Sequence, residues 1–212
     1  LDATRSIATF IKKGNIVILE STSPVGTTDK ICMEFANLGI DTDTVYIAYC
    51  PERVLPGKIM IELIENDRIV GGINPKSTEI VVDFYKTFVQ GQVLATNSKT
   101  AEMCKLTENS YRDVSIAFAN ELSMICDKAG IDVWDLIILA NHHPRVNILQ
   151  PGAGVGGHCI AVDPWFLVSD FPDESRIIKT GREVNNSKTQ WVLQKIKDST
   201  SLFEKMNHRK PV

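Results

Sequence analysis

The chain has 212 residues, of which 43% are hydrophobic and 23% are charged, and its formal net charge is −3. This length suits one large domain or two small ones, and no apolar run approaches the roughly 18 residues that cross a bilayer. The small negative charge and the lack of a basic, apolar leader argue against nucleic-acid partners, membrane partners and secretion. Because the chain starts at Leu1 inside a helix-like stretch, we expect a piece of a longer polypeptide.

Residues 1–97 alternate between helical and strand periods. Helices are predicted over 2–13, 27–38 and 75–90, each followed by a glycine, and short strands over 15–20, 45–49, 68–72 and 92–96. Short strands that alternate with helices predict a parallel sheet covered by helices. The fold class is therefore α/β, and this region is predicted to be part of a doubly wound domain.

The strands stop near residue 98, and the region 98–197 is predicted to be mostly helical. Helices are expected over 100–129, 133–141 and 174–198. The first of them contains neither glycine nor proline and would be roughly 45 Å long. The last is expected to be weakened at Gly181, and residues 198–212 have no clear period and are predicted to be a frayed or truncated tail.

The long predicted helix carries a polar stripe formed by Lys105, Asn109 and Arg112, which fall within a narrow sector at about 100° per residue. Its apolar residues, Phe118 and Ile125 among them, fall on the opposite side. The stripe can be the solvated side of an amphipathic helix. Alternatively, a lysine, a carboxamide and an arginine on adjacent turns can bind a substrate oxygen and a phosphate together.

The stretch "PGAGVGGHCIAVDP", residues 151–164, contains a G-x-G-x-x-G pattern at Gly152, Gly154 and Gly157. A dinucleotide loop needs a strand before the glycines and a helix that opens at the third. Pro151 and Pro164 interrupt both flanks, so this interpretation is disfavoured. Glycines also let a backbone close tightly over another ligand.

Cys159 follows these glycines, and Asp163 lies four positions further on, so the two share a face if a helical turn follows the loop. A thiol with a pKa of about 8.5 needs a positive neighbour or a base to ionise, and Lys105 is a candidate. His158 is adjacent and is expected to point away. A zinc site formed by His142, His143, His158 and Cys159 would lack any standard ligand spacing, so no metal is predicted.

All five cysteines, Cys32, Cys50, Cys104, Cys126 and Cys159, lack a C-x-x-C pairing. Their odd number and wide spacing argue against a disulfide framework, and we expect a reducing, cytoplasmic location. The four other than Cys159 are expected to be small buried hydrophobic residues.

Five ordered motifs together resemble the UDP-sugar 6-dehydrogenase family, which includes UDP-glucose and UDP-N-acetyl-D-mannosamine dehydrogenases. The motifs are "ESTSPVGTT", "YCPERVLPG", "TAEMCKLTENSYRD", "HHPRVNILQPGAGVGGHCIAVDP" and "GREVNNSK". The wording "CPERVLPG" and "HPRVNILQPG" is most similar to the bacterial enzymes that act on UDP-N-acetyl-D-mannosamine for surface polysaccharides. The resemblance extends over nearly the whole chain, to about residue 197.

The resemblance implies a four-electron oxidation of a sugar CH2OH to a carboxylate with two NAD+. Cys159 matches the cysteine that forms a thiohemiacetal and then a thioester. Lys105 and Asn109 match the groups that handle the hydroxyl proton and the developing oxyanion. Asp163 matches the carboxylate that orders that lysine and the water, and Glu52 the carboxylate placed for thioester hydrolysis.

The resemblance also implies which residues bind ligands and how chains associate. Thr22 matches a threonine near the nicotinamide. Substrate contacts are implied for Arg53, Val54, Arg112, His143, Arg145 and Gly154. The chain would hold the second half of the NAD-binding domain and the central helical domain, without the phosphate-binding glycine loop or the final UDP-binding domain, and helix 100–129 would form a homodimer.

At two positions the chain departs from the UDP-glucose enzymes of the family. Those enzymes often carry a lysine where this chain has Val162 and a glutamate where it has Pro56. The resemblance therefore favours an N-acetylated sugar over glucose. UDP-glucose and UDP-N-acetylglucosamine stay as alternative substrates. A two-electron 3-hydroxyacid dehydrogenase would share the Lys-x-x-x-Asn pair, but it needs no covalent trap such as Cys159. A third alternative is a dimerising module without catalytic activity.

Overall fold

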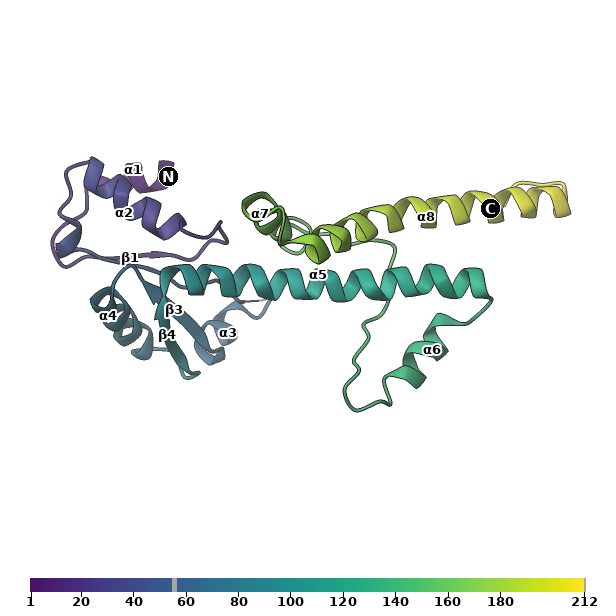
Figure 1. The fold of residues 1–212 in the computed structure, drawn as a ribbon, viewed down its shortest axis with the longest axis horizontal. Helices are drawn as coiled ribbons and strands as arrows, with labels where there is room; N and C mark the ends of the chain where they lie inside the picture. The colour runs from purple at the N-terminus through teal and green to yellow at the C-terminus, as the bar shows by residue number, and fades with distance from the viewer. Residues whose placement is uncertain (55–56, 212) are drawn as a thin grey trace. The chain divides into compact units, whose positions relative to one another are not determined.

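The computed structural model describes residues 1–54 and 57–211, so Pro56 lies outside the described residues. The chain divides into two compact units, residues 1–107 and 108–212, and the division falls inside the long helix α5 (Ser98–Ala129; Figure 1). The domain boundary was expected at residue 98, which is the first residue of this helix, whereas the division falls after residue 107.

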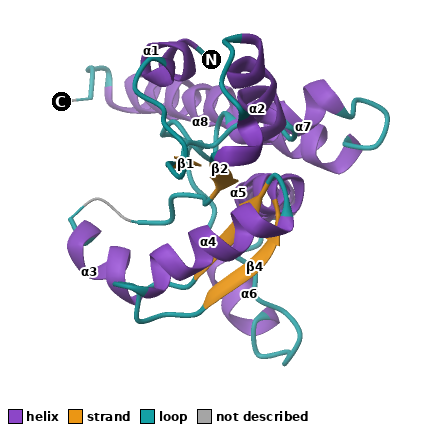
Figure 2. Ribbon diagram, turned by 90° about the vertical axis from the view of Figure 1, so that its left-hand side faces the viewer, coloured by secondary structure: helices purple, strands orange, loops and turns teal. Residues whose placement is uncertain are grey.

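The first unit is built on a four-stranded sheet with the order β1-β2-β3-β4. Figure 2 draws the strands in orange. The strands are β1 (Ile16–Leu19), β2 (Tyr46–Tyr49), β3 (Arg68–Gly72) and β4 (Val93–Asn97). The helices are α1 (Asp2–Ala8), α2 (Thr27–Asn37), α3 (Ile59–Glu65) and α4 (Pro75–Lys86), with a 3-10 turn at Thr42–Thr44. All four predicted strands are present, so the α/β class is confirmed. Helix α3 was not expected.

The sheet is mixed, although a parallel sheet was expected. Strand β1 pairs with β2 in parallel, and β3 pairs with β4 in parallel, but β2 and β3 are antiparallel, with Tyr49 opposite Gly71. Two antiparallel strands need no crossover connection, because the connection leaves the first strand and enters the second at the same end of the strands. The connection between β2 and β3 includes the seven-residue α3 and returns in this way, so the expectation of an all-parallel sheet was wrong at this pair.

Helices cover both faces of the sheet because neighbouring strand residues point to opposite sides. Ile47 packs in one core cluster with Ile31 and Phe35 of α2. Ala48, the next residue, packs in a second cluster with residues of α4 such as Val81. The first unit therefore has the layer order helix, sheet, helix that is usual for a doubly wound α/β domain.

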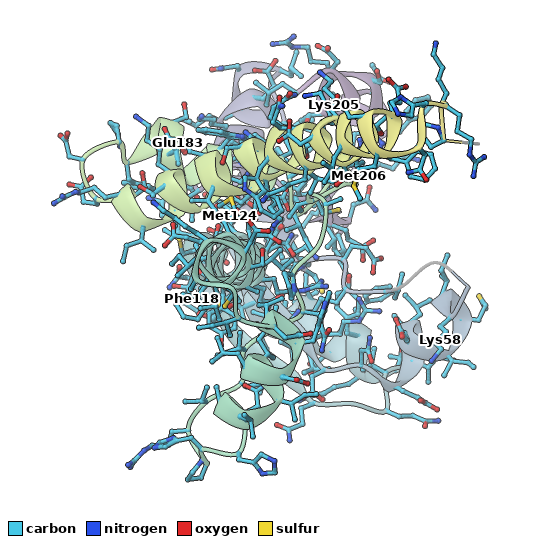
Figure 3. The ribbon with its side chains drawn as sticks, turned by 90° about the vertical axis from the view of Figure 1, so that its right-hand side faces the viewer. Lys58, Phe118, Met124, Glu183, Lys205 and Met206 are labelled. Atoms are coloured by element: carbon cyan, nitrogen blue, oxygen red, sulfur yellow. The ribbon has the colours of Figure 1, made fainter. Side chains whose placement is uncertain are left out.

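The second unit is helical and is dominated by two helices of 32 residues, α5 and α8 (Arg176–Asn207). Between them lie α6 (Val133–Ala140) and α7 (Asp163–Asp170). Figure 3 shows Met124 of α5 on the side that faces α8 and Glu183 on the outer side of α8. Among the described residues, no helix combines the length and apolarity that a membrane span requires.

Helix α8 differs from the sequence expectation at two places. It passes through Gly181 without a break, and it continues to Asn207, where a frayed end was expected from residue 198. A Cβ at Gly181 would lie 3.2 Å from Val114 Cγ2 and 3.6 Å from Ala117 Cβ. The glycine therefore permits the close packing of α8 on α5, and this packing outweighs the low helix propensity of glycine.

Candidate functional site

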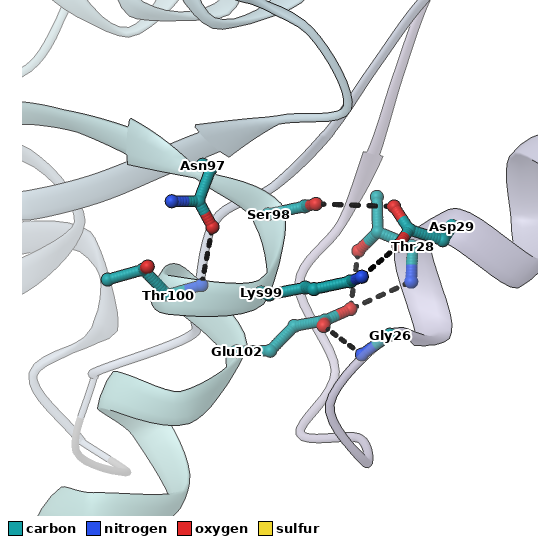
Figure 4. Close-up of polar contacts among 8 residues, drawn as sticks. All are labelled: Gly26, Thr28, Asp29, Asn97, Ser98, Lys99, Thr100 and Glu102. Atoms are coloured by element: carbon teal, nitrogen blue, oxygen red, sulfur yellow. Dashed lines mark hydrogen bonds and ion pairs between the residues drawn. The ribbon is translucent and has the colours of Figure 1, made fainter.

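The loop after β1 carries Thr22 and is tied to α5 through a buried carboxylate. Glu102 accepts hydrogen bonds from Gly26 N at 2.5 Å, Thr28 N at 2.7 Å and Thr28 Oγ1 at 2.7 Å (Figure 4). Gly26, the N-cap residue that precedes α2, lies in the left-handed region with φ 87°, where a side chain would be strained. Glu102 thus caps α2 from another helix and fixes the loop in which Thr22 is half-buried.

The first residues of α5 form further polar contacts next to the Glu102 cap. Asn97 Oδ1 accepts a hydrogen bond from Thr100 N at 2.9 Å, and Lys99 Nζ pairs with Asp29 at 3.2 Å (Figure 4). Both contacts lie within the first unit. They fix the first turn of α5, and Lys105 lies on the next turn of the same helix.

Glu52, Arg53 and Val54 follow the carboxyl end of β2. Glu52 Oε1 accepts a hydrogen bond from Val54 N, and the Arg53 carbonyl accepts one from Asn66 Nδ2 at 3.4 Å. Lys105 Nζ donates to the Glu52 backbone oxygen at 2.5 Å. The structure therefore brings Lys105 to the predicted Glu52 segment, while the Glu52 carboxylate is engaged by its own loop.

The segment that carries Cys159 forms a second group of predicted residues. Asp163 N donates to the Cys159 carbonyl at 2.8 Å, so a helical turn joins them. Asn109 Nδ2 donates to Asp163 Oδ2 at 2.5 Å, and Asn109 and Asp163 are 6% and 4% exposed. Cys159 itself is exposed. A reachable thiol thus lies on one turn with a buried carboxylate that is held by a carboxamide.

The predicted polar stripe of α5 is not one uniformly solvated face. Asn109 is buried, Lys105 is half-buried and Arg112 is exposed. On the side predicted to be apolar, Phe118 and Ile125 are 56% and 57% exposed. Helix α5 therefore buries polar residues such as Asn109 and leaves apolar residues such as Phe118 exposed.

The remaining predicted substrate residues lie on exposed segments of the second unit. His143 and Arg145 lie in the turn after α6, where Arg145 N donates to His143 Nδ1 at 3.3 Å. Gly154 lies against α8, because a Cβ there would be 2.5 Å from Thr189 Oγ1. The structure joins these residues to no common contact among the described side chains.

Two titratable groups in the core of the first unit have raised pKa values. Burial raises the pKa of the Cys50 thiol to about 11, and the buried Tyr85 phenol beside it, which donates to Glu20 at 2.6 Å, has a raised pKa as well. Cys50 therefore stays a neutral thiol at neutral pH. Within residues 1–54 and 57–211, no cluster of three or more histidines, cysteines or carboxylates could hold a metal ion.

Sequence reasoning missed several buried polar residues, among them Glu102, Asn120 and Asn185. Glu102 and Asn120 lie on α5 with Asn109 and Asp113, and all four fall within about 40° of one another at 100° per residue. Their exposures are 0%, 0%, 6% and 0%. This helical spacing of polar residues was the available signal.

Comparison with known proteins gives two matching family models. Residues 1–89 match the NAD binding domain of the UDP-glucose/GDP-mannose dehydrogenase family, and residues 99–187 match its central domain. A UDP-N-acetyl-D-mannosamine dehydrogenase of Campylobacter jejuni is 59% identical over 204 residues, which cover 92% of this chain and 50% of that protein. The chain thus spans about half the length of this curated relative.

Solved structures show the same relationship. A UDP-D-ManNAc dehydrogenase from Pyrococcus horikoshii superposes with a TM-score of 0.88 at 40% identity, over 97% of this chain and 49% of that one. The UDP-N-acetyl-mannosamine dehydrogenase Cap5O from S. aureus superposes with a TM-score of 0.86 at 49% identity, over 95% and 49% of the two chains.

Proposed function

Because the chain belongs to the UDP-glucose/GDP-mannose dehydrogenase family, we propose that the full-length polypeptide containing it oxidises UDP-N-acetyl-D-mannosamine to the uronate with NAD+. The observation that carries the chemistry is the exposed Cys159 on one helical turn with the buried pair Asp163 and Asn109. The product would serve bacterial surface polysaccharides, and the free cysteines favour a cytoplasmic location.

The proposed reaction converts one CH2OH group and one water into a carboxylate, with two hydrides and three protons released. Two NAD+ molecules, bound one after the other, would each accept one hydride. The Cys159 sulfur adds to the aldehyde carbon to form a thiohemiacetal, and loss of the second hydride leaves a thioester. Water then attacks the thioester carbon, and the C–S bond breaks to release the acid and the thiol. Covalent capture keeps the aldehyde from escaping between the two oxidations.

The other polar residues are proposed to move protons and stabilise charge. Lys105 accepts the hydroxyl proton and stabilises the developing oxyanion, with Asn109 as a hydrogen-bond donor. Asp163 orders the lysine and the water, and Glu52 assists hydrolysis of the thioester. The support is the burial of Asp163 and Asn109 and the contact of Lys105 with the Glu52 segment.

The arrangement of the first unit fits a nicotinamide cofactor. Thr22 follows β1 and Glu52 follows β2, and these neighbouring parallel strands end at the same edge of the sheet. Ligands of doubly wound sheets bind at the carboxyl ends of the strands. We propose that Thr22 contacts the nicotinamide. The proposed contacts to the UDP-sugar are Arg53, Val54, Arg112, His143, Arg145 and the backbone of Gly154.

Replacing Lys105 with alanine in the full-length polypeptide is expected to lower kcat by on the order of 10²-fold or more, because a proton-transfer group is lost. The KM for the sugar nucleotide is expected to change much less. Steady-state NADH formation measures both. Lys76→Ala is the matched control, since Lys76 lies in the first unit in an exposed ion pair with Glu79. An unchanged kcat for Lys105→Ala would assign this lysine a structural role only.

The exposed apolar side of α5 is the proposed surface for a homodimer. Phe118 projects from it with 56% exposure, and Ile125 lies two turns later with 57% exposure. Exposed large apolar residues on one helix face are typical of an interface. Phe118→Glu is expected to shift the protein from dimer to monomer in sedimentation equilibrium, whereas Met60→Glu in the first unit is not. Unchanged mass for Phe118→Glu would place the interface elsewhere.

The substrate is tested by a coupled NADH assay of the full-length polypeptide with UDP-N-acetylmannosamine, UDP-N-acetylglucosamine and UDP-glucose. We expect the highest kcat/KM with the first. Preference for UDP-glucose would contradict the substrate assignment and leave the proposed chemistry intact. Absence of activity with all three, in a polypeptide that binds NAD+, would favour the alternative of a dimerising module without catalytic activity.

A further inference from the structure

The segment "GREVNNSK", residues 181–188, has no role in the proposed chemistry, yet its polar side chains are buried in the second unit. Arg182 is 2% exposed, Asn185 is 1% exposed and Lys188 is 4% exposed. Burying polar groups is costly unless they are hydrogen-bonded, so their partners show what the segment does.

These partners form a continuous chain of hydrogen bonds that ends at the glycine loop. Asn185 Nδ2 donates to Asp113 Oδ1 at 2.8 Å, and Arg182 Nη1 donates to the same oxygen at 2.6 Å. Asn120 Nδ2 donates to Asn185 Oδ1 at 2.9 Å. Gly152 N donates to Asn120 Oδ1 at 2.8 Å.

The groups at the two ends of this series of hydrogen bonds determine the direction in which every bond of the series is donated. The Asp113 carboxylate can only accept hydrogen bonds, and the Gly152 backbone N–H can only donate one. Each carboxamide between them must therefore direct its oxygen toward the glycine loop and its nitrogen toward Asp113. Asn120 and Asn185 satisfy this requirement, and both are buried at 0% and 1% exposure. A single orientation is favoured, so the chain can hold Gly152 in one place.

The held residue lies in the loop that leads to Cys159. The next loop residue is held as well, because Thr189 Oγ1 donates to the Ala153 carbonyl at 3.0 Å. The long helices α5 and α8 thus clamp the amino end of the glycine loop, while α7 holds its carboxyl end at Asp163.

We propose that Asn120 and Asn185 are positioning residues that hold the glycine loop and, through it, the reactive segment around Cys159. The effect on catalysis rests on the proposed dehydrogenase function, whereas the effect on the loop does not. The two asparagines touch neither substrate nor cofactor in this proposal.

The test is hydrogen exchange of the 212-residue chain, followed by mass spectrometry of peptides from residues 147–162. Asn120→Leu and Asn185→Leu keep the side-chain size but break the chain of hydrogen bonds. We expect exchange in the loop to become about tenfold faster or more, the effect of losing one buried hydrogen bond. Peptides from α6 are expected to keep their exchange rates. Asn186→Leu is the matched control, because Asn186 is exposed on the same helix and accepts a hydrogen bond from Arg182 Nη2 at 2.7 Å without being a member of the hydrogen-bond series that reaches Gly152.

A double mutant separates positioning from general destabilisation. If both asparagines act through one series of hydrogen bonds, the loop amides of the Asn120→Leu, Asn185→Leu double mutant exchange no faster than those of Asn120→Leu alone. Additive increases, equal increases in α6, or an unchanged loop would overturn the proposal. Should a leucine variant fail to fold, Asn120→Ser and Asn185→Ser are measured in the same way with the same expected pattern.

Kinetics of the full-length polypeptide connect the loop to turnover. Both leucine variants are expected to lower kcat about tenfold with little change in the KM for NAD+, since the loop carries the nucleophile and not the proposed cofactor contact. Faster loop exchange with an unchanged kcat would overturn the catalytic part of the proposal. A wild-type polypeptide without dehydrogenase activity would refute the proposed function, while the exchange result would still decide whether the loop is held.

Discussion

Replacing Cys159 with serine in the full-length polypeptide is expected to lower uronate formation by at least about 10³-fold. The first hydride transfer needs no sulfur, so the variant still oxidises the alcohol to the aldehyde. Without a thiol, no thioester forms, and the second oxidation stops. The ratio of NADH to sugar consumed is therefore expected to fall from two to at most one, which spectrophotometry and product chromatography measure together.

Cys32→Ser is the matched control, because Cys32 is a half-buried free cysteine on α2 outside the proposed site. This variant is expected to keep two NADH per sugar. If Cys159→Ser also forms two NADH per sugar at the wild-type rate, Cys159 is not the nucleophile.

Replacing Glu102 with alanine is expected to lower the free energy of unfolding of the first unit by about 3–5 kcal/mol. Glu102 is fully buried and accepts three hydrogen bonds from Gly26 and Thr28. The alanine variant leaves these donors buried without an acceptor. Glu102→Gln keeps the size and one oxygen, so a smaller loss of about 1–3 kcal/mol is expected. Hydrogen exchange of peptides from residues 16–49 in increasing urea measures the loss.

Glu79→Gln is the control for the Glu102 variants, since Glu79 forms an exposed ion pair with Lys76 at 2.9 Å on α4. Its effect is expected to stay within about 0.5 kcal/mol. If Glu102→Ala destabilises the unit no more than this control does, the cap does not hold the Thr22 loop.

The strands and most helices of the first unit could be predicted because their signals are local. Apolar runs such as Ile16–Leu19 end at polar or glycine residues, and Pro75 begins a helix that Asn74 caps through Ser77 N. The antiparallel pairing of β2 and β3 could not be predicted, because it depends on the path of the connection between them. Nothing in the alternation of strands and helices distinguishes a crossover from a return to the same edge.

The contacts of the site could be predicted where the residues lie on one helical turn. Contacts between residues that are far apart in the sequence could not be predicted. The turn from Cys159 to Asp163 follows from their spacing. The burial of Glu102 and Asn120 does not follow from the hydrophobic pattern, which predicts that polar residues face solvent. Their partners, Gly26, Thr28, Gly152 and Asn185, lie between 32 and 76 positions away in the sequence. Only the tertiary fold supplies the acceptors and donors that make this burial stable.

The central claim, a covalent bond between the Cys159 sulfur and the sugar during turnover, is tested most directly by rapid acid quenching of the full-length polypeptide. The enzyme is mixed with UDP-N-acetylmannosamine and NAD+, quenched, digested and analysed by mass spectrometry. We predict a substrate-derived mass on the peptide that contains Cys159 and no such mass in Cys159→Ser. NADH formation at the normal rate with an unmodified Cys159 peptide at every quench time would contradict the claim.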